Sequence, residues 1–192
     1  EQVAPNPQTI SPSAFKPQQV MDDWRSMGMM DFLQVSSFEP VTRDDFKRVH
    51  NPQMVDDVLD LRRRNGFRNT DPQIAASLPY TSGSMLAAAR WTLANRCPAC
   101  SPTSGFHHAG FDETEGYCTF NGLMVTAVKL LDERLVRTVS ILDCDVHEGN
   151  GTQNIIDRLG LQRQIQHHSM GYHFQTREQA GPDAVHFEAW LS

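Results

Sequence analysis

The chain has 192 residues, a length typical of one domain, and its 39% hydrophobic and 21% charged residues are those of a globular rather than a disordered protein. Its formal net charge of -6 argues against a general nucleic-acid-binding or anionic-membrane surface, and no apolar run approaches the length that spans a bilayer. We therefore expect a single domain over residues 1–192 that binds neither nucleic acid nor a membrane.

The first part of the chain is predicted to be mostly helical. Residues 1–19 are rich in Pro, Gln and Ser and are predicted to be irregular. A helix is expected over residues 20–29, followed by a short strand over residues 32–35. Thr42-Arg-Asp-Asp45 resembles a capping box with Asp in place of the usual Glu, so another helix should begin there.

Three further helical stretches follow. Asn51-Pro52 starts the first, with Asn as cap and Pro in the first turn, and Asn65-Gly66 is expected to close it. Asp71-Pro72 opens the second. Proline and glycine between residues 79 and 83 predict a break, after which a third helix should run over residues 84–95.

The second half of the chain alternates between helices and apolar strands. A loop over residues 101–118 precedes a helix around 123–131, a buried strand over 136–144, a helix over 152–159, a strand over 164–168 and a helix over 184–191. This alternation predicts an α/β protein of three αβα layers with a mostly parallel sheet.

The four cysteines are Cys97, Cys100, Cys118 and Cys144. Cys97-Pro-Ala-Cys100 has the spacing of a redox or zinc motif. It follows a predicted helix rather than a strand, however, and a zinc ribbon needs a second cysteine pair. We therefore expect ordinary reduced thiols, which are typical of a cytoplasmic protein.

The predicted strand 136–144 ends in three polar side chains at alternate positions. In an extended chain, Asp143, Asp145 and His147 project from one face, at the end of the strand where open α/β sheets bind ligands. Such a group without a cation would be repulsive or unsatisfied, and mixed carboxylate and imidazole donors suit Zn²⁺ or Fe²⁺. The Gly149-Asn150-Gly151 sequence allows a tight turn beside this site.

A second candidate element is the histidine pair His107-His108 in a glycine-flanked loop. Imidazole is the natural proton shuttle near neutral pH. Taken alone, neighbouring loop histidines are more often surface residues, and an Asp-x-Asp-x-His strand end also suits a helix cap, a salt-bridge cluster or a nucleotide-metal site. A metal-dependent phosphohydrolase is therefore an alternative, although no phosphate-binding glycine loop is visible.

Three motifs in combination resemble the histone deacetylase superfamily, which includes the acetylpolyamine amidohydrolases. They are Ser104-Gly-Phe-His-His-Ala109, Gly116-Tyr-Cys-Thr-Phe-Asn121 and Ile141 to Gln153, in the order and at the spacing of that family. The resemblance runs from about Asp31 to about Gly160, and Asn150-Gly-Thr152 is closer to the class II and bacterial branch. It implies an arginase/deacetylase-like fold and hydrolysis of acetyl-lysine or acetylpolyamine amides.

The resemblance also implies a role for each matching residue. Asp145 and His147 would be zinc ligands, and Gly116 and Tyr117 would form walls of the channel for the acyl group. His108 would act as general base and acid, oriented by Asn150. His107 would be an electrostatic helper, oriented by Asp143, which would also lie near a structural K⁺.

Some expected parts of the family pattern have no match in this sequence. The third zinc ligand, an aspartate, and the oxyanion tyrosine lie later in the family than Ser192, which predicts a C-terminally truncated domain with an incomplete sheet. Glu148 replaces a histidine of many relatives, and His167-His168 stands near the family's potassium site. The alternative to an amidohydrolase is a non-catalytic remnant that binds metal weakly and self-associates through its open sheet edge.

Overall fold

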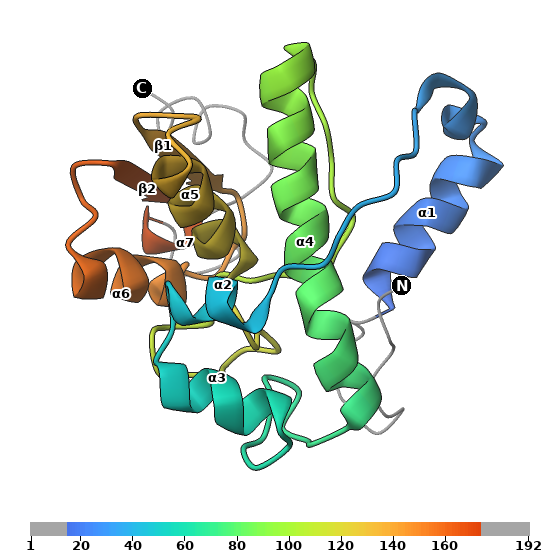
Figure 1. Cartoon of the computed structure of the whole chain (residues 1–192). Helices are drawn as coiled ribbons and strands as arrows, with labels where there is room; N and C mark the ends of the chain where they lie inside the picture. The colour runs from blue at the N-terminus through green and yellow to red at the C-terminus, as the bar shows by residue number, and fades with distance from the viewer. Residues whose placement is uncertain (1–14, 174–192) are drawn as a thin grey trace.

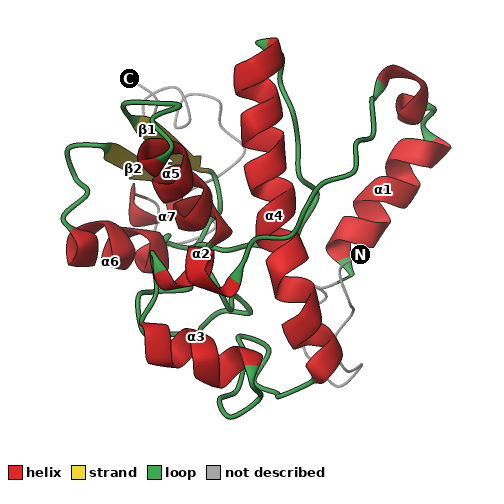
Figure 2. Cartoon of the chain, viewed as in Figure 1, coloured by secondary structure: helices red, strands yellow, loops and turns green. Residues whose placement is uncertain are grey.

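The computed structural model describes residues 15–173, which are mostly helical, with a small parallel sheet at one side of the molecule beside the last three described helices (Figures 1 and 2). The elements are α1 (Lys16–Ser26), the 3-10 helix η1 (Met29–Phe32), α2 (Arg43–Lys47), α3 (Pro52–Leu59), α4 (Pro72–Asn95), α5 (Gly122–Asp132), β1 (Val139–Asp143), α6 (Asn150–Leu159), β2 (Ile165–Ser169) and α7 (Met170–His173). The predicted α/β class is therefore confirmed. Among these residues, no helix is both long and apolar enough to cross a membrane.

Strands β1 and β2 pair in parallel and are joined by α6. Parallel neighbours need such a crossover, because the chain must return to the starting edge before the second strand begins. The register runs from Val139 opposite Ile165 to Asp143 opposite Ser169. It therefore places Asp143 and Ser169 side by side at the carboxyl end of the sheet.

The hydrophobic core lies around α5, which packs against α4 (Figure 1). Met124 and Val125 of α5 are at most 1% exposed. The rings of Phe46 and Phe120 lie 4.3 Å apart between centroids and pack closely in this core. Burial of these side chains fixes α5 and hence the loop that precedes it.

The predicted helix starts at Thr42 and Asn51 are present. The Thr42 hydroxyl accepts from the Asp45 amide, and the Asp45 carboxylate accepts from the Thr42 amide at 2.9 Å, which completes a capping box. The Asn51 side chain accepts from the Gln53 amide at 2.9 Å. Aspartate thus replaces glutamate in the box without loss of either bond.

The predicted break between residues 79 and 83 is wrong, because α4 is continuous from Pro72 to Asn95. Its proline and glycine instead accommodate a crossing segment. The Pro79 carbonyl accepts from the Val41 amide at 3.1 Å, and a Cβ on Gly83 would lie 2.6 Å from the Glu39 carbonyl oxygen. Pro79 and Gly83 therefore mark a place where another backbone segment approaches the helix closely, rather than the end of the helix.

Other boundaries also differ from expectation. Helix α1 begins at Lys16, inside the segment predicted to be irregular, and the strand predicted over 32–35 is absent, with Phe32 and Val35 exposed by 90% and 70%. Helix α3 ends at Leu59, before Asn65-Gly66, and Leu61 then takes a positive φ of 64°. Gly66 instead packs on the Cys118 backbone. The helix predicted over 184–191 lies outside the described residues.

Candidate active site

Three segments meet at the carboxyl end of β1. They are the loop that carries His107 and His108, the turn after Asp143, and the first turn of α6, which begins at Asn150. The Thr152 amide of α6 donates to the His107 carbonyl at 3.0 Å, so the helix and the loop are held directly together. The two separate sequence motifs thus form one cluster.

His107 and Asp143 form a hydrogen-bonded pair whose side chains are largely buried. The His107 Nδ1 lies 2.7 Å from the Asp143 Oδ2, with 11% and 8% of the two side chains exposed. Burial would lower the pKa of His107, but the hydrogen bond and charge of Asp143 outweigh it and raise that pKa. Burial would likewise raise the pKa of Asp143, and the His107 bond instead leaves it well below its usual range. His107 is therefore favoured as a cation next to an ionised carboxylate.

His108 has a neutral partner instead. Its Nδ1 lies 2.6 Å from the Asn150 Oδ1, and its ring centroid is 4.1 Å from that of His107. An amide oxygen only accepts, so Nδ1 carries the proton and the neutral ring keeps its lone pair on Nε2. The two adjacent histidines therefore have different electrostatic roles: one is paired with a carboxylate and the other presents a free acceptor nitrogen.

Asp145 and His147 face each other on the exposed side of the turn. The Asp145 Oδ1 lies 2.9 Å from the His147 Nδ1 and accepts from the His147 amide at 2.8 Å. Desolvation would raise the pKa of Asp145, and the His147 bonds outweigh it and lower that pKa. The ring of His147 lies 5.9 Å between centroids from that of His108. A carboxylate oxygen and an imidazole nitrogen thus converge beside the histidine pair.

The chemistry and convergence of these two donors fit part of a divalent metal site. Mixed oxygen and nitrogen donors suit Zn²⁺, but a catalytic zinc normally has three protein ligands. Within residues 15–173, no group of three or more His, Cys, Asp or Glu side chains is placed to hold a metal ion. Asp145 and His147 therefore supply two donors of a ligand set that the described residues do not complete.

Glycines surround both histidines closely. A Cβ on Gly116, whose φ is +55°, would lie 2.3 Å from the His108 Cδ2, and one on Gly151 would lie 2.4 Å from the His108 carbonyl carbon. A Cβ on Gly149 would lie 2.5 Å from the Asp143 Oδ2. No side chain fits at these positions unless the histidines or Asp143 move.

Replacing Gly116 with alanine is expected to destabilise the protein and displace the His108 ring. The positive φ alone disfavours alanine by about 1 kcal/mol, and the contact with the ring adds to this. Urea denaturation would measure the loss, and the imidazole NMR signals of His108 would report the displacement. Gly160→Ala is the matched control, because Gly160 also has a positive φ but no atom near its would-be Cβ. Equal effects on His108 in both variants would contradict the prediction.

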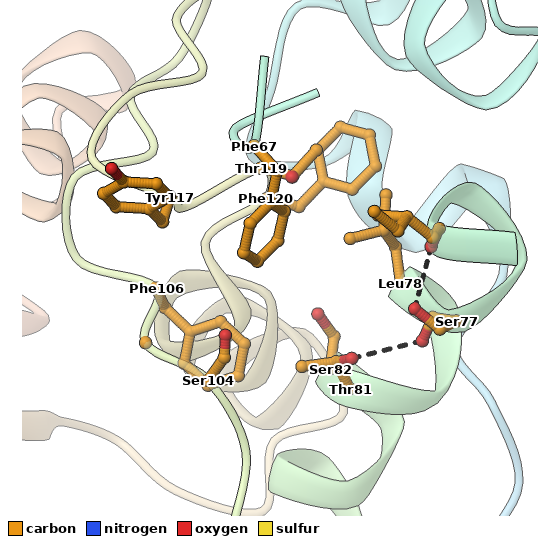
Figure 3. A pocket seen from close by; sticks show the side chains of 12 residues that line it. Phe67, Ser77, Leu78, Thr81, Ser82, Ser104, Phe106, Tyr117, Thr119 and Phe120 are labelled. Carbon is orange, nitrogen blue, oxygen red and sulfur yellow. Dashed lines mark hydrogen bonds between the residues drawn. The ribbon is translucent and has the colours of Figure 1, made fainter. Parts of the chain in front are cut away.

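Tyr117, the residue that follows Gly116 in the sequence, also has a positive φ, of 64°. Its ring centroid is 6.0 Å from that of Phe67. Both rings line a pocket between α4 and the loops before α5 (Figure 3), together with Ile74, Ser77, Leu78, Thr81, Ser82, Ser104, Gly105, Phe106, Thr119 and Phe120. No histidine of the described part of the chain lines this pocket, so it is separate from the His107–His108 pair.

The sequence left the roles of Glu148 and of His167-His168 open. Glu148 and His168 are exposed, whereas the side chain of His167 is only 3% exposed. The His167 Nε2 lies 3.9 Å from the Asp143 Oδ2 and, among described residues, has no hydrogen-bond partner. Its Nδ1 lies 3.3 Å from the Gln153 Oε1. Parallel pairing of β2 with β1 thus brings a third histidine beside Asp143.

Two buried residues at the site were missed as functional candidates. His50 and Asn121 are both 0% exposed and hydrogen bonded to each other and to the loop behind His108. No local pattern distinguishes His50 in the sequence, because its partners lie about 60 and 71 positions away. Asn121 belongs to one of the sequence motifs but had no role assigned to it, and only the packed structure gives a role to either residue.

Comparison with known proteins gives consistent results. A profile of the histone deacetylase domain matches residues 12–177. The chain is 46% identical over 61 residues to the acetylpolyamine amidohydrolase of Mycoplana ramosa, covering 32% of this chain and 17% of that protein. It is 28% identical over 138 residues to histone deacetylase 10, chloroplastic, of Oryza sativa subsp. japonica, covering 62% of this chain and 31% of that protein.

The fold also matches a solved structure. The crystal structure of the HDA15 HD domain superposes with a TM-score of 0.66 at 21% identity, covering 82% of this chain and 46% of that one. The likeness therefore extends over most of this chain. The match spans less than half of that solved chain, and less than a third of each of the two curated relatives above.

Proposed function

The chain belongs to the histone deacetylase family, and from this we propose that its histidine cluster hydrolyses the amide bond of an acetylated amine. The substrate class is acetyl-lysine or an acetylated polyamine. The observation that carries the proposal is the pairing of His107 with Asp143 and of His108 with Asn150 at the end of one strand. This arrangement places a histidine paired with a carboxylate directly beside a histidine paired with a neutral amide.

In this proposal Asp145 and His147 hold a divalent cation, Zn²⁺ by preference and Fe²⁺ as the alternative. Such a cation, when bound, polarises a carbonyl and lowers the pKa of a bound water. The remaining coordination has to come from groups outside the described cluster. The proposal also includes a structural K⁺ near Asp143, as in the family that the sequence resembles.

His108 is proposed as the proton carrier. Its free Nε2 takes a proton from the attacking water as the new carbon–oxygen bond forms, and Asn150 keeps the ring oriented by accepting from Nδ1. The carbon–nitrogen bond then breaks, and the same proton goes to the departing amine. The immediate products are acetic acid and the free amine, and transfer of the acid proton to the amine leaves acetate and an ammonium ion, so atoms and charge balance.

His107 is proposed as an electrostatic partner rather than a second base. Its hydrogen bond to the ionised Asp143 raises its pKa and favours the imidazolium form. A fixed positive charge 4.1 Å between ring centroids from His108 stabilises negative charge that develops on the substrate carbonyl. Gly116 and Tyr117 are proposed to border the route by which the acyl group reaches this point.

The test combines metal binding with turnover. The purified chain would be titrated with Zn²⁺ by calorimetry and assayed for acetate release from an acetyl-lysine peptide and from an acetylated polyamine. Asp145→Asn is expected to weaken Zn²⁺ binding and activity by at least about 10- to 100-fold. Loss of a residue that only supports a metal ligand already has an effect of about this size, and Asp145 is proposed as a ligand itself. Asp22→Asn is the control, because Asp22 is an exposed carboxylate of α1, paired with Arg25.

A second function is favoured by one observation. The described residues do not complete a three-donor metal site, which fits a non-catalytic member of the family that binds metal weakly and self-associates. Zinc binding without acetate release from either substrate, together with a dimer in analytical ultracentrifugation, would support this function and contradict the catalytic one.

A further inference from the structure

The loop behind the tandem histidines is held by its backbone carbonyls. Each of four carbonyls accepts a hydrogen bond from a residue far away in the sequence. The bonds are Thr152 amide to His107 at 3.0 Å, Asn121 Nδ2 to Ala109 at 3.2 Å, His50 Nδ1 to Gly110 at 2.8 Å, and Asn51 amide to Phe111 at 2.7 Å. The loop has little regular structure of its own, so these bonds determine where it lies.

His50 is the residue that joins this loop to the start of α5. Its side chain is fully buried, and its Nε2 accepts from the Asn121 backbone amide at 2.9 Å. Because Nε2 accepts, Nδ1 carries the proton in the neutral ring and donates it to the Gly110 carbonyl. Burial lowers the pKa of His50 to about 4, which keeps the ring in this neutral form at ordinary pH.

Asn121 extends the same connection to α6. Its Nδ2 donates to the Ala109 carbonyl and, at 3.0 Å, to the Thr152 hydroxyl, while its Oδ1 accepts from the Met124 amide at 3.1 Å and caps α5. The Thr152 amide in turn holds the His107 carbonyl. One buried network therefore links His50, the cap of α5, the first turn of α6 and the backbone on both sides of His108.

We propose that His50 is a positioning residue that sets the places of His107 and His108 through Gly110 and Asn121. The hydrogen bonds of His50 go to the Gly110 carbonyl and the Asn121 amide rather than to either ring of the pair, so it acts through the backbone between them. His107 must meet Asp143 at the end of β1, and His108 must meet Asn150 at the start of α6. Misplacement of a catalytic group by about 1 Å costs roughly 100-fold in rate. The expected loss of rate rests on the proposed function, whereas the expected displacement of His107 and His108 does not.

Two substitutions of His50 distinguish the contribution of its hydrogen bonds from that of its packing. In His50→Phe the aromatic volume remains, but the Gly110 carbonyl and the Asn121 amide lose their buried partner. In His50→Gln a planar amide offers a donor and an acceptor side by side, as the imidazole does. We expect the Gln variant to keep the loop in place and the Phe variant to release it.

The readout is the NMR signal of the proton that His107 shares with Asp143, which reports that hydrogen bond without any need for turnover. It is expected to shift or be lost in His50→Phe and to stay near its wild-type position in His50→Gln. Val58→Ala is the control, because it perturbs the buried core without changing a hydrogen-bonding side chain. An unmoved signal in a folded His50→Phe protein, or an equal shift in Val58→Ala, would overturn the proposal.

If His50→Phe does not fold, Thr152→Val tests the same network more mildly. It removes the hydroxyl that accepts from Asn121 but keeps the side-chain shape and the backbone bond to His107. A smaller shift of the same signal is expected, and no shift would overturn the proposal.

Enzyme kinetics of the His50 variants provide a second test. In a folded His50→Phe protein, kcat for acetate release should fall roughly 10- to 100-fold, as for other residues that orient a ligand or base, with KM within about twofold. His50→Gln should restore most of it. Absence of activity in the wild-type chain would contradict the proposed function while leaving the NMR result to decide the role of His50.

Discussion

Replacing His108 with glutamine is expected to reduce kcat for acetate release roughly 10²- to 10⁴-fold, the usual contribution of a general acid–base residue. Glutamine has a similar reach and no charge, but its amide cannot take up a proton from water. Among the described residues, the His108 ring makes one side-chain hydrogen bond, to Asn150, so the loss of folding stability should be only about 1 kcal/mol. The large effect is therefore expected in the chemical step alone.

The measurement is steady-state kinetics at saturating metal, together with urea denaturation. His168→Gln is the matched control, because it makes the same substitution in an exposed histidine of β2. A kcat within a few-fold of wild type in His108→Gln would contradict the assignment of His108 as base. Equal losses in both variants would point to a general effect of removing imidazole rather than to a role of this one.

The second large effect is a loss of folding stability in weak acid that depends on His50. Its folded pKa is lowered to about 4 by burial, whereas histidine in an unfolded chain titrates near 6.5. Below about pH 6.5 the unfolded state therefore binds the proton more readily. Stability is fully present above that pH and falls as the pH decreases towards about 4. A difference of about 2.5 pKa units corresponds to about 3 kcal/mol.

Other groups titrate with different signs or in different ranges. The raised pKa of His107 works in the opposite direction, since protonation of this residue favours the folded state. The lowered pKa of Asp143 removes stability only as the pH falls through the carboxyl range. His50→Gln keeps both groups and removes only the titration of His50. The difference between wild type and this variant therefore isolates His50.

Urea denaturation at pH 7 and pH 4.5 would measure this difference. The wild-type free energy of unfolding should fall more between the two pH values than that of His50→Gln, by about 2 to 3 kcal/mol. Identical pH dependence in the two proteins would mean that His50 has the same pKa in the folded and unfolded states, and would contradict the prediction.

Much of the fold followed from local pattern. The caps at Thr42 and Asn51 and the apolar run before Asp143 predicted elements that the structure contains, because each depends on neighbours within one turn or one strand. The boundaries that differed depend on distant residues. Pro79 and Gly83 predicted a break, but the segment at Glu39 to Val41 packs across them and the helix continues.

The candidate site shows the same division. Alternation along an extended strand put Asp143, Asp145 and His147 on one face in the prediction, and family resemblance paired His107 with Asp143 and His108 with Asn150. The structure has both contacts, at 2.7 and 2.6 Å. The roles of these residues in catalysis remain proposals, to be tested by the variants above.

The sequence by itself determined the family, the α/β class and the residues of the two motifs, since these rest on residue identity and short spacing. Only the tertiary structure decided what surrounds them. Parallel pairing of β1 and β2 placed the buried His167 at 3.9 Å from Asp143. Packing of α5 and α6 enclosed His50 and Asn121 behind the histidine loop. The physical reason is that a buried polar group must find a partner wherever the fold brings one, and sequence distance carries no information about that partner. The histidines themselves were visible in the sequence, and the network that holds them in place was not.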